Sequence, residues 1–179
     1  MKGLIFTEFF EVVEEAFGLE VCEEMLTQAD DDGVYTSVGS YDHKKLVKMI
    51  IILSQLTDVP VGDLQEVFGQ KAFTTLMQGL PIPTDNITNT IDFIQHVETF
   101  IHVEVRKLYP DATLPTFEFI SVSPTQLIMD YLSPRCMGHV CLGLIKGCAA
   151  HFNEEIAVDM VPVDELGSHM RFTVDKLSV

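Results

Sequence analysis

His102 stands in a segment whose apolar residues are spaced for one face of a helix. The segment 91–108 carries apolar side chains three or four residues apart, at Ile94, Val97, Ile101 and Val105, which predicts an amphipathic helix. A histidine that projects from a rigid helix into an apolar interior is a suitable axial ligand for a haem iron. The alternative is a histidine packed or hydrogen-bonded in the core, and a single histidine does not decide between them.

A second group of polar residues, Tyr131, Ser133 and Arg135, occupies alternate positions of the segment Tyr-Leu-Ser-Pro-Arg. In an extended chain alternate side chains point the same way, so a phenol, a hydroxyl and a guanidinium would share one side. Such donors could hold two carboxylates, because a buried carboxylate needs hydrogen bonds or a counter-charge, and arginine can bind it bidentately. A strand end with an ordinary surface salt bridge would carry the same residue types.

Together the two motifs resemble the haem nitric oxide/oxygen binding (H-NOX) family, which also supplies the haem domain of soluble guanylate cyclase. The most specific part is the segment 102–115, His-Val-Glu-Val-Arg-Lys-Leu-Tyr-Pro-Asp-Ala-Thr-Leu-Pro, followed downstream by Tyr-Leu-Ser-Pro-Arg. The likeness covers nearly the whole chain, from Met-Lys-Gly-Leu-Ile at 1–5, through Val-Phe-Gly at 67–69, to Leu-Gly-Leu-Ile-Lys-Gly at 142–147. It implies haem b as the cofactor.

The resemblance also implies roles for individual residues. His102 would be the proximal iron ligand. The haem propionates would be held by Tyr131, Ser133 and Arg135, and the porphyrin would be bent by contact with Ile5 and Pro115.

The expected distal side of the haem is apolar. Val140 stands where similar oxygen-binding proteins carry a tyrosine, and the other expected wall residues are Phe9, Ala72, Leu76 and Leu144. Bound dioxygen gains from a distal hydrogen bond, whereas nitric oxide and carbon monoxide bind ferrous haem well in an apolar pocket. The expected ligands are therefore nitric oxide and carbon monoxide.

The mechanism that the resemblance implies is signalling rather than catalysis. Nitric oxide would weaken or break the bond between iron and His102, so that the surrounding helix shifts and the porphyrin relaxes against Pro115 and Ile5. The displaced surface would regulate a separate protein, and similar proteins act on a histidine kinase or a cyclic-dinucleotide enzyme. No catalytic residue is expected.

Two other classes of function remain open on the sequence. A haem enzyme, such as a peroxidase or a nitric oxide dioxygenase, would need a distal acid or base, for which His139 is the nearest candidate. A carrier of an apolar ligand without haem would need only a large pocket.

The cysteines and remaining histidines give no metal motif. Many bacterial relatives look alike in holding zinc near the C-terminus, but the cysteines expected around 160–172 are absent, and Cys136, His139, Cys141 and His169 match no closed zinc spacing. With Cys22 and Cys148 they do not form a disulfide framework, so reduced thiols are expected. A redox role for Cys136 or Cys141 would need an electropositive setting that the sequence does not show.

Composition indicates one globular domain over 1–179. A chain of 20.1 kDa can bury roughly 70% of its unfolded surface. Eleven basic against 27 acidic residues give a net charge of −16, which disfavours nucleic acid and anionic membranes. The longest apolar run is too short to cross a bilayer, and acidic residues interrupt any signal peptide. A cytoplasmic location is expected.

The elements that must position the site follow from periodicity and breakers. Helices are predicted over 4–17, 21–26, 41–56, 64–80, 91–108 and 137–152, with a turn at 30–33 and a proline-forced loop at 81–84. Strands are predicted over 117–122, 126–131, 156–161 and 170–174, the first two as a hairpin. The predicted class is α+β, an N-terminal helical part followed by an antiparallel sheet with helices, enclosing a haem.

Overall fold

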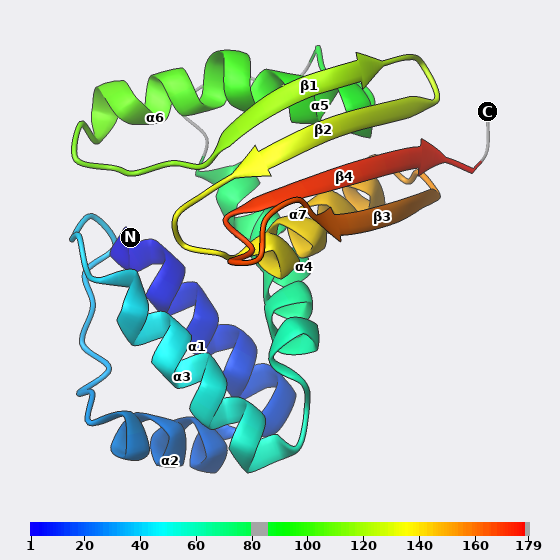
Figure 1. The fold of residues 1–179 in the computed structure, drawn as a ribbon. Helices are drawn as coiled ribbons and strands as arrows, with labels where there is room; N and C mark the ends of the chain where they lie inside the picture. The colour runs from blue at the N-terminus through cyan, green and yellow to red at the C-terminus, as the bar shows by residue number, and fades with distance from the viewer. Residues whose placement is uncertain (80–85, 178–179) are drawn as a thin grey trace.

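Three helices form the N-terminal part of the molecule, as predicted: α1 (Gly3–Phe17), α2 (Leu19–Ala29) and α3 (His43–Thr57). They lie together in the blue and cyan lower half of Figure 1. The computed structural model describes residues 1–79 and 86–177, so the predicted loop at 81–84 lies outside the described residues. Helix α3 begins after Asp42, whose carboxylate accepts the Lys44 N–H at 3.0 Å and so satisfies one free donor of the first turn.

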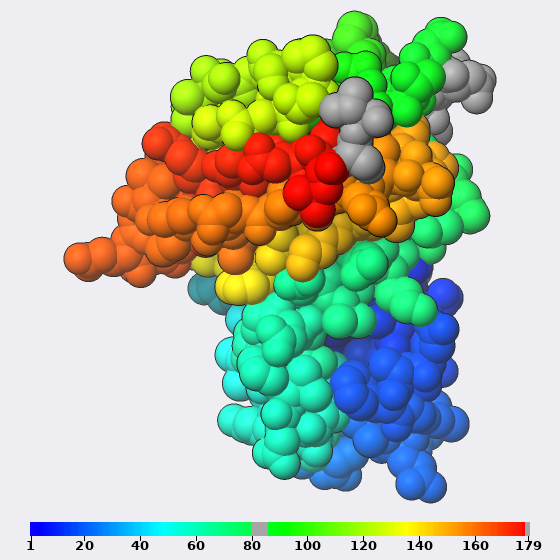
Figure 2. Space-filling view, turned by 90° about the vertical axis from the view of Figure 1, so that its right-hand side faces the viewer, coloured from blue at the N-terminus to red at the C-terminus, as the bar shows by residue number. Residues whose placement is uncertain are grey.

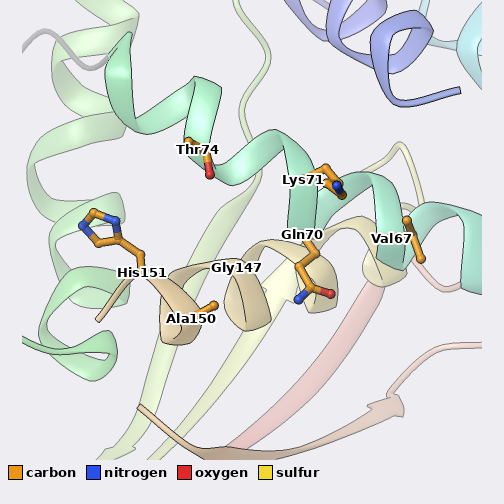
Figure 3. A pocket seen from close by; sticks show the side chains of 7 residues that line it. All are labelled: Val67, Gln70, Lys71, Thr74, Gly147, Ala150 and His151. Atoms are coloured by element: carbon orange, nitrogen blue, oxygen red, sulfur yellow. The ribbon is translucent and has the colours of Figure 1, made fainter. Parts of the chain in front are cut away.

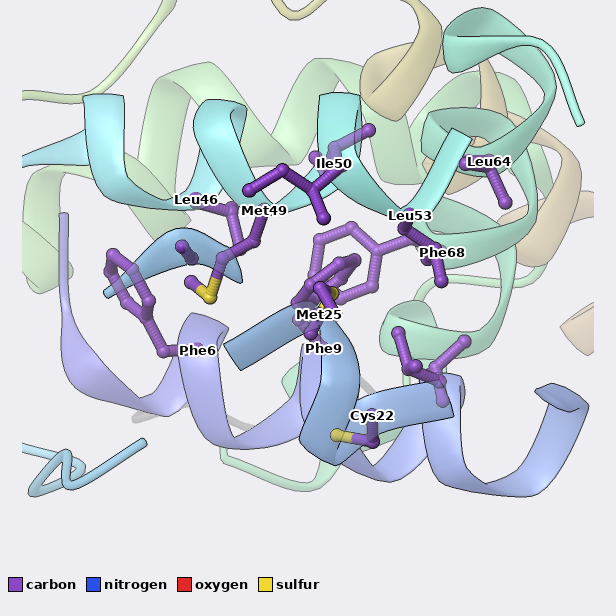
Figure 4. Close-up of a cluster of buried hydrophobic side chains, with 14 of the residues drawn as sticks. Phe6, Phe9, Cys22, Met25, Leu46, Met49, Ile50, Leu53, Leu64 and Phe68 are labelled. Atoms are coloured by element: carbon purple, nitrogen blue, oxygen red, sulfur yellow. The ribbon is translucent and has the colours of Figure 1, made fainter. Parts of the chain in front are cut away.

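The core of this helical part is built from one apolar face of each helix. Phe6, Phe9 and Val13 of α1 are almost fully buried, and their spacing of three and four residues places them on one side of the helix. Figure 4 shows Phe6 and Phe9 among side chains of α2, α3 and the helix that follows, including Met25, Leu53 and Phe68.

Helices α4 (Val61–Gln78) and α7 (Gly138–His151) cross with their backbones in contact. A Cβ atom on Gly69 would lie 2.2 Å from the carbonyl oxygen of Val140, and one on Gly143 would lie 2.0 Å from that of Glu66. Only glycine permits such an approach. Figure 1 shows α4 running from the N-terminal helices to the half of the molecule that holds α7.

The second half is a four-stranded antiparallel sheet of β1 (Thr116–Val122), β2 (Gln126–Leu132), β3 (Ile156–Pro162) and β4 (His169–Lys176) in the order β1-β2-β4-β3. The four predicted strands and the α+β class are confirmed. Tyr131 pairs with Phe117 on one side and with Met170 on the other. Because side chains alternate along a strand, Tyr131 and Met129 both face the buried side of the sheet, against α7.

The predicted helix over 91–108 differs in its middle. The segment consists of α5 (Thr90–His96), a π-helical turn η1 (Val97–Ile101) and α6 (His102–Leu108). The His102 N–H donates to the Val97 carbonyl, five residues earlier. A π turn inserts one extra residue into the helix, and such turns are frequent at functional sites. The apolar spacing alone does not distinguish this arrangement from a regular α-helix.

The elements gather into two lobes. Figure 2 shows the N-terminal helices as a lower lobe beneath the larger lobe of the sheet and its helices. Within the described ranges, no helix combines the length and apolar character that crossing a membrane requires.

Candidate functional site

A cavity of about 440 Å³ lies between the two lobes. It is lined from α1, α4, α5, η1, α6, the first two strands and α7, and from the loops that hold Ser37, Ser40 and residues 109–115. Its volume falls within the roughly 300–1,000 Å³ typical of small-molecule and cofactor pockets. The walls are mostly apolar, with a few polar groups, which is the usual composition of a cofactor site.

Nearly all the residues that the sequence singled out line this one cavity. They come from six separate segments of the chain and are Ile5, Ala72, Leu76, His102, Pro115, Tyr131, Ser133, Arg135, Val140 and Leu144. The fold therefore brings the predicted iron ligand, the predicted propionate contacts and most of the predicted distal wall together.

Phe9 does not reach the lining. Its side chain is 1% exposed in the core of the N-terminal helices. It packs edge-on against Phe68 with ring centroids 5.5 Å apart, and Phe68 does line the cavity. Phe9 therefore lies one layer behind the cavity wall instead of in it. Helical spacing shows which face of a helix a residue occupies, but not whether the residue reaches the cavity.

His102 is the first residue of α6 and is only 8% exposed. Its Nδ1 lies 3.0 Å from Oε2 of Glu98, and its ring packs against the Phe117 ring at 5.6 Å. Burial lowers the pKa of His102 while the Glu98 hydrogen bond acts to raise it. A neutral imidazole that donates through Nδ1 keeps the lone pair of Nε2 for a metal.

Tyr131 and Ser133 provide buried hydroxyl groups at the end of β2, with 5% and 4% exposure. Burial raises the pKa of Tyr131 to about 12, so its phenol remains a hydrogen-bond donor at neutral pH. Ser133 is held by its N–H, which donates to the Ser168 carbonyl at 2.8 Å. The Ser133 hydroxyl in turn accepts the backbone N–H of Arg135 at 3.3 Å.

Arg135 lies partly buried at the same end of the cavity, and burial lowers its pKa. No carboxylate of the residues that the structure describes forms a salt bridge with it. A partly buried guanidinium beside two buried hydroxyl groups favours an anionic ligand group at this position. The carboxylates of a haem would meet that requirement, and the apolar walls suit its macrocycle.

Two features of the site were not predicted from the sequence. One is Glu98, whose position four residues before His102 was the available signal, since such pairs meet on a helix. The other is a polar cluster at the cavity, where Lys2 Nζ lies 3.0 Å from Asp111 Oδ1 and 2.8 Å from Ser40 Oγ. These residues are far apart in sequence, so no local pattern could join them.

The residues considered for zinc or catalysis do not assemble. His139 is exposed and lies against Gly62 rather than in the cavity, while Nε2 of His169 donates to the Asp130 carboxylate at 2.8 Å. In the described part of the chain no three metal-ligating side chains stand close enough to hold an ion. Cys136 is exposed, whereas burial raises the pKa of Cys141 to about 12, so Cys141 is a neutral thiol.

A second hollow of about 470 Å³ lies elsewhere along the α4 and α7 pair. Figure 3 shows its lining, which includes Lys71, Thr74 and His151. None of the predicted site residues lines it, so it is not the place where the sequence motifs converge.

The fold and the site define a haem-binding domain of the α+β class. The family model for haem-NO-binding proteins matches residues 2–160. The chain belongs to this haem-NO-binding, or H-NOX, family, and haem is the family's cofactor.

Several solved structures are similar to the chain. The Fe(II) unliganded H-NOX protein from K. algicida is 36% identical, with a TM-score of 0.94 over 100% of this chain and 98% of that one. H-NOX from Shewanella woodyi in the Fe(II)CO state is 34% identical, with a TM-score of 0.81 over 98% and 94%. An H-NOX protein from S. oneidensis in the Fe(II)NO state is 26% identical, with a TM-score of 0.86 over 99% and 100%. A comparison with curated proteins found no match.

Proposed function

We propose that this chain is a haem-based sensor of nitric oxide, with carbon monoxide as a second ligand. The observation that carries the proposal is one apolar cavity containing a buried histidine, His102, together with the donors Tyr131, Ser133 and Arg135. Two similar proteins have been studied in Fe(II)NO and Fe(II)CO states, which supports the choice of gases.

In this proposal His102 holds the iron through Nε2, because its Nδ1 faces Glu98. The two propionates take the hydroxyl groups of Tyr131 and Ser133 and the guanidinium of Arg135. When bound, haem supplies a ferrous iron with one coordination position open to a gas. Ile5 and Pro115 line the cavity from α1 and from the loop before β1, which supports their proposed contact with the macrocycle.

The distal wall favours nitric oxide over oxygen. Among the described residues, α4 and α7 contribute no hydroxyl, amide or charged side chain to the lining. The strongest donors that these helices offer are the thiols of Cys141 and Cys148, and thiols are weak donors. Bound dioxygen would therefore lack a good hydrogen bond, whereas nitric oxide does not need one.

The same wall argues against a haem enzyme. Cleavage of an O–O bond needs a distal acid or base in reach of the bound ligand. His139, the candidate from the sequence, is exposed and outside the lining. We therefore propose a sensor without catalytic residues.

We propose further that the signal passes to a separate partner, a histidine kinase or a cyclic-dinucleotide enzyme. The support is the position of His102 on a helical segment that also carries exposed apolar side chains, with Phe100 of η1 55% and Val103 of α6 39% exposed. Release of the imidazole would let this helix shift, so a contact made through its outer side would change with the gas. An imidazole-rescued His102→Gly variant that binds nitric oxide and still signals identically would contradict this step.

The first test is the absorption spectrum of the ferrous protein before and after nitric oxide, on wild type and His102→Ala. We expect a five-coordinate Soret band that shifts with nitric oxide and carbon monoxide, does not change in air on the same timescale, and is lost in the variant. His96→Ala is the matched control, because His96 lies on the preceding turn of the same helical segment and outside the lining. Absence of a Soret band after haem reconstitution, or an unchanged spectrum in His102→Ala, would overturn the proposal.

A further inference from the structure

We propose that Glu98 is a positioning residue for His102, and that its carboxylate sets the strength of the bond between His102 and the haem iron. This inference rests on the proposed function, in which His102 is the iron ligand. It adds a residue that controls how readily that bond breaks.

The contact between the two side chains is close and mostly shielded from water. Nδ1 of His102 lies 3.0 Å from Oε2 of Glu98, with side-chain exposures of 10% and 20%. A hydrogen bond from Nδ1–H to a carboxylate fixes the ring tautomer and the ring plane, and leaves Nε2 as the ligand atom. The carboxylate therefore selects the nitrogen that faces the iron.

Glu98 is itself held by groups other than His102. The backbone N–H of Phe117 donates to the same Oε2 at 3.1 Å, and Arg106 Nη2 lies 3.8 Å from Oε1. An exposed ion pair between two free side chains contributes little because both ends move. Here the first residues of β1 anchor the carboxylate, so its position does not depend on the histidine that it holds.

The backbone between the two residues is the π turn. Glu98 lies within η1, and the His102 N–H bonds to Val97 across the wide turn. The Glu98 carboxylate accepts hydrogen bonds from His102, at the end of this turn, and from Phe117, in strand β1. One carboxylate therefore links the turn to the strand. Movement of the imidazole would therefore reach β1 through the hydrogen bonds of Glu98, in addition to the direct packing of the His102 ring against Phe117.

The chemical effect follows from charge. A carboxylate that accepts the Nδ1 proton raises the electron density on Nε2, which strengthens its bond to iron and stabilises the oxidised metal. Loss of that carboxylate weakens the iron–histidine bond, raises the reduction potential and speeds release of the histidine when nitric oxide binds. Outer-shell partners of metal-bound histidines typically change metal affinity or activity by about 10–100-fold.

The test compares Glu98→Gln and Glu98→Leu with wild type in the haem-loaded protein. Glutamine keeps an acceptor oxygen without the charge, and leucine removes both. The matched control is Glu104→Gln, two residues after His102 on the same helix, where Glu104 pairs with Lys107 at 2.6 Å. The readouts are the iron–histidine stretching frequency by resonance Raman, the reduction potential, and the rate at which that bond breaks after nitric oxide is added.

We expect the iron–histidine stretching frequency to fall, and the reduction potential to rise, from wild type to Glu98→Gln to Glu98→Leu. The iron–histidine bond should break on the order of tenfold faster in Glu98→Leu. Glu104→Gln should match wild type in all three measurements. If Glu98→Leu does not load haem, the comparison of Glu98→Gln with wild type is sufficient to test the inference. Wild-type values in Glu98→Gln, or an equal shift in Glu104→Gln, would overturn the inference while His102 ligation and nitric oxide binding stand. Loss of the proposed function itself would appear instead as a wild-type protein without the His102-dependent Soret band.

Discussion

At the residue scale, selectivity for a gas depends on one missing donor. Val140 lines the cavity from α7, and its neighbours on that wall are Ala72, Leu76 and Leu144. We predict that Val140→Tyr binds oxygen in air, because a phenol there would donate to the bound ligand. A hydrogen bond to a charged acceptor contributes about 1.5–3 kcal/mol, which corresponds to roughly 10–150-fold in affinity.

Oxygen binding by this variant is measured from the ferrous spectrum in air and from the oxygen dissociation rate. Val140→Phe is the control, since it adds a ring of nearly the same size without the hydroxyl group. If Val140→Phe stabilises the oxygen complex equally, or Val140→Tyr fails to do so while still binding carbon monoxide, the role assigned to the missing donor is wrong.

Residue types and local spacing singled out polar residues that the fold brings to one cavity. His102 and the alternating donors Tyr131, Ser133 and Arg135 line one cavity, because helix and strand periodicities fix which side chains share a face. Phe9 was placed one layer too near the cavity, since spacing gives the face of a helix but not the depth behind a wall. Contacts between distant segments, such as Lys2 with Asp111, have no local signal.

At the element scale, the predicted helices and strands were confirmed but their irregularities were not foreseen. The segment 91–108 is interrupted by η1, because a π turn changes the hydrogen-bond register without changing composition. The sheet order β1-β2-β4-β3 is likewise set by tertiary packing. The alternation of apolar and polar residues along a strand predicts which face of that strand is buried. It does not predict which other strand pairs with it.

Asp130 joins β2 to β4 and supplies a pH-dependent part of the stability. Hydrogen bonds from Arg171 at 2.7 and 2.9 Å, and from His169 at 2.8 Å, outweigh its burial and hold the pKa of Asp130 at about 2. Its unfolded value is about 3.9. The stabilisation is therefore complete above about pH 4 and is lost as the pH falls through 2.

We predict that Asp130→Asn lowers the free energy of unfolding by roughly 2 kcal/mol at pH 7, and that the difference from wild type shrinks towards pH 2. Urea unfolding at several pH values measures it. Asp159→Asn, exposed on the neighbouring strand β3, is the control and should be neutral. A pH-independent loss in Asp130→Asn would mean that shape, not charge, is responsible.

At the scale of the whole molecule, the cavity lies where separate parts of the core meet. Phe68 belongs to the cluster of N-terminal helices, Tyr131 to the cluster beneath the sheet, and Phe73 to a third cluster with Phe93, and all four line the cavity. We propose that residues 1–179 unfold as one domain, because a bound cofactor would contact all three clusters.

Haem loading should then raise the stability of both lobes together. A ligand at 1,000 times its dissociation constant adds about 4 kcal/mol, and each kcal/mol moves the melting temperature of a protein this size by roughly 2–4 °C. We expect a single calorimetric transition that shifts upward by about 8–16 °C on reconstitution. Two separate transitions, or a shift confined to one of them, would contradict the one-domain proposal.

The glycine contacts between α4 and α7 have a consequence for how this sequence can diverge over evolution. A methyl group on Gly69 or Gly143 would occupy the space of a backbone oxygen, so these positions are constrained by the crossing of two helices and not by iron. In a lineage that abandoned haem, His102 would be free to drift while the glycines stayed. Descendants that keep Gly69 and Gly143 without His102 would therefore be recognisable as the same fold after the sensor function has disappeared.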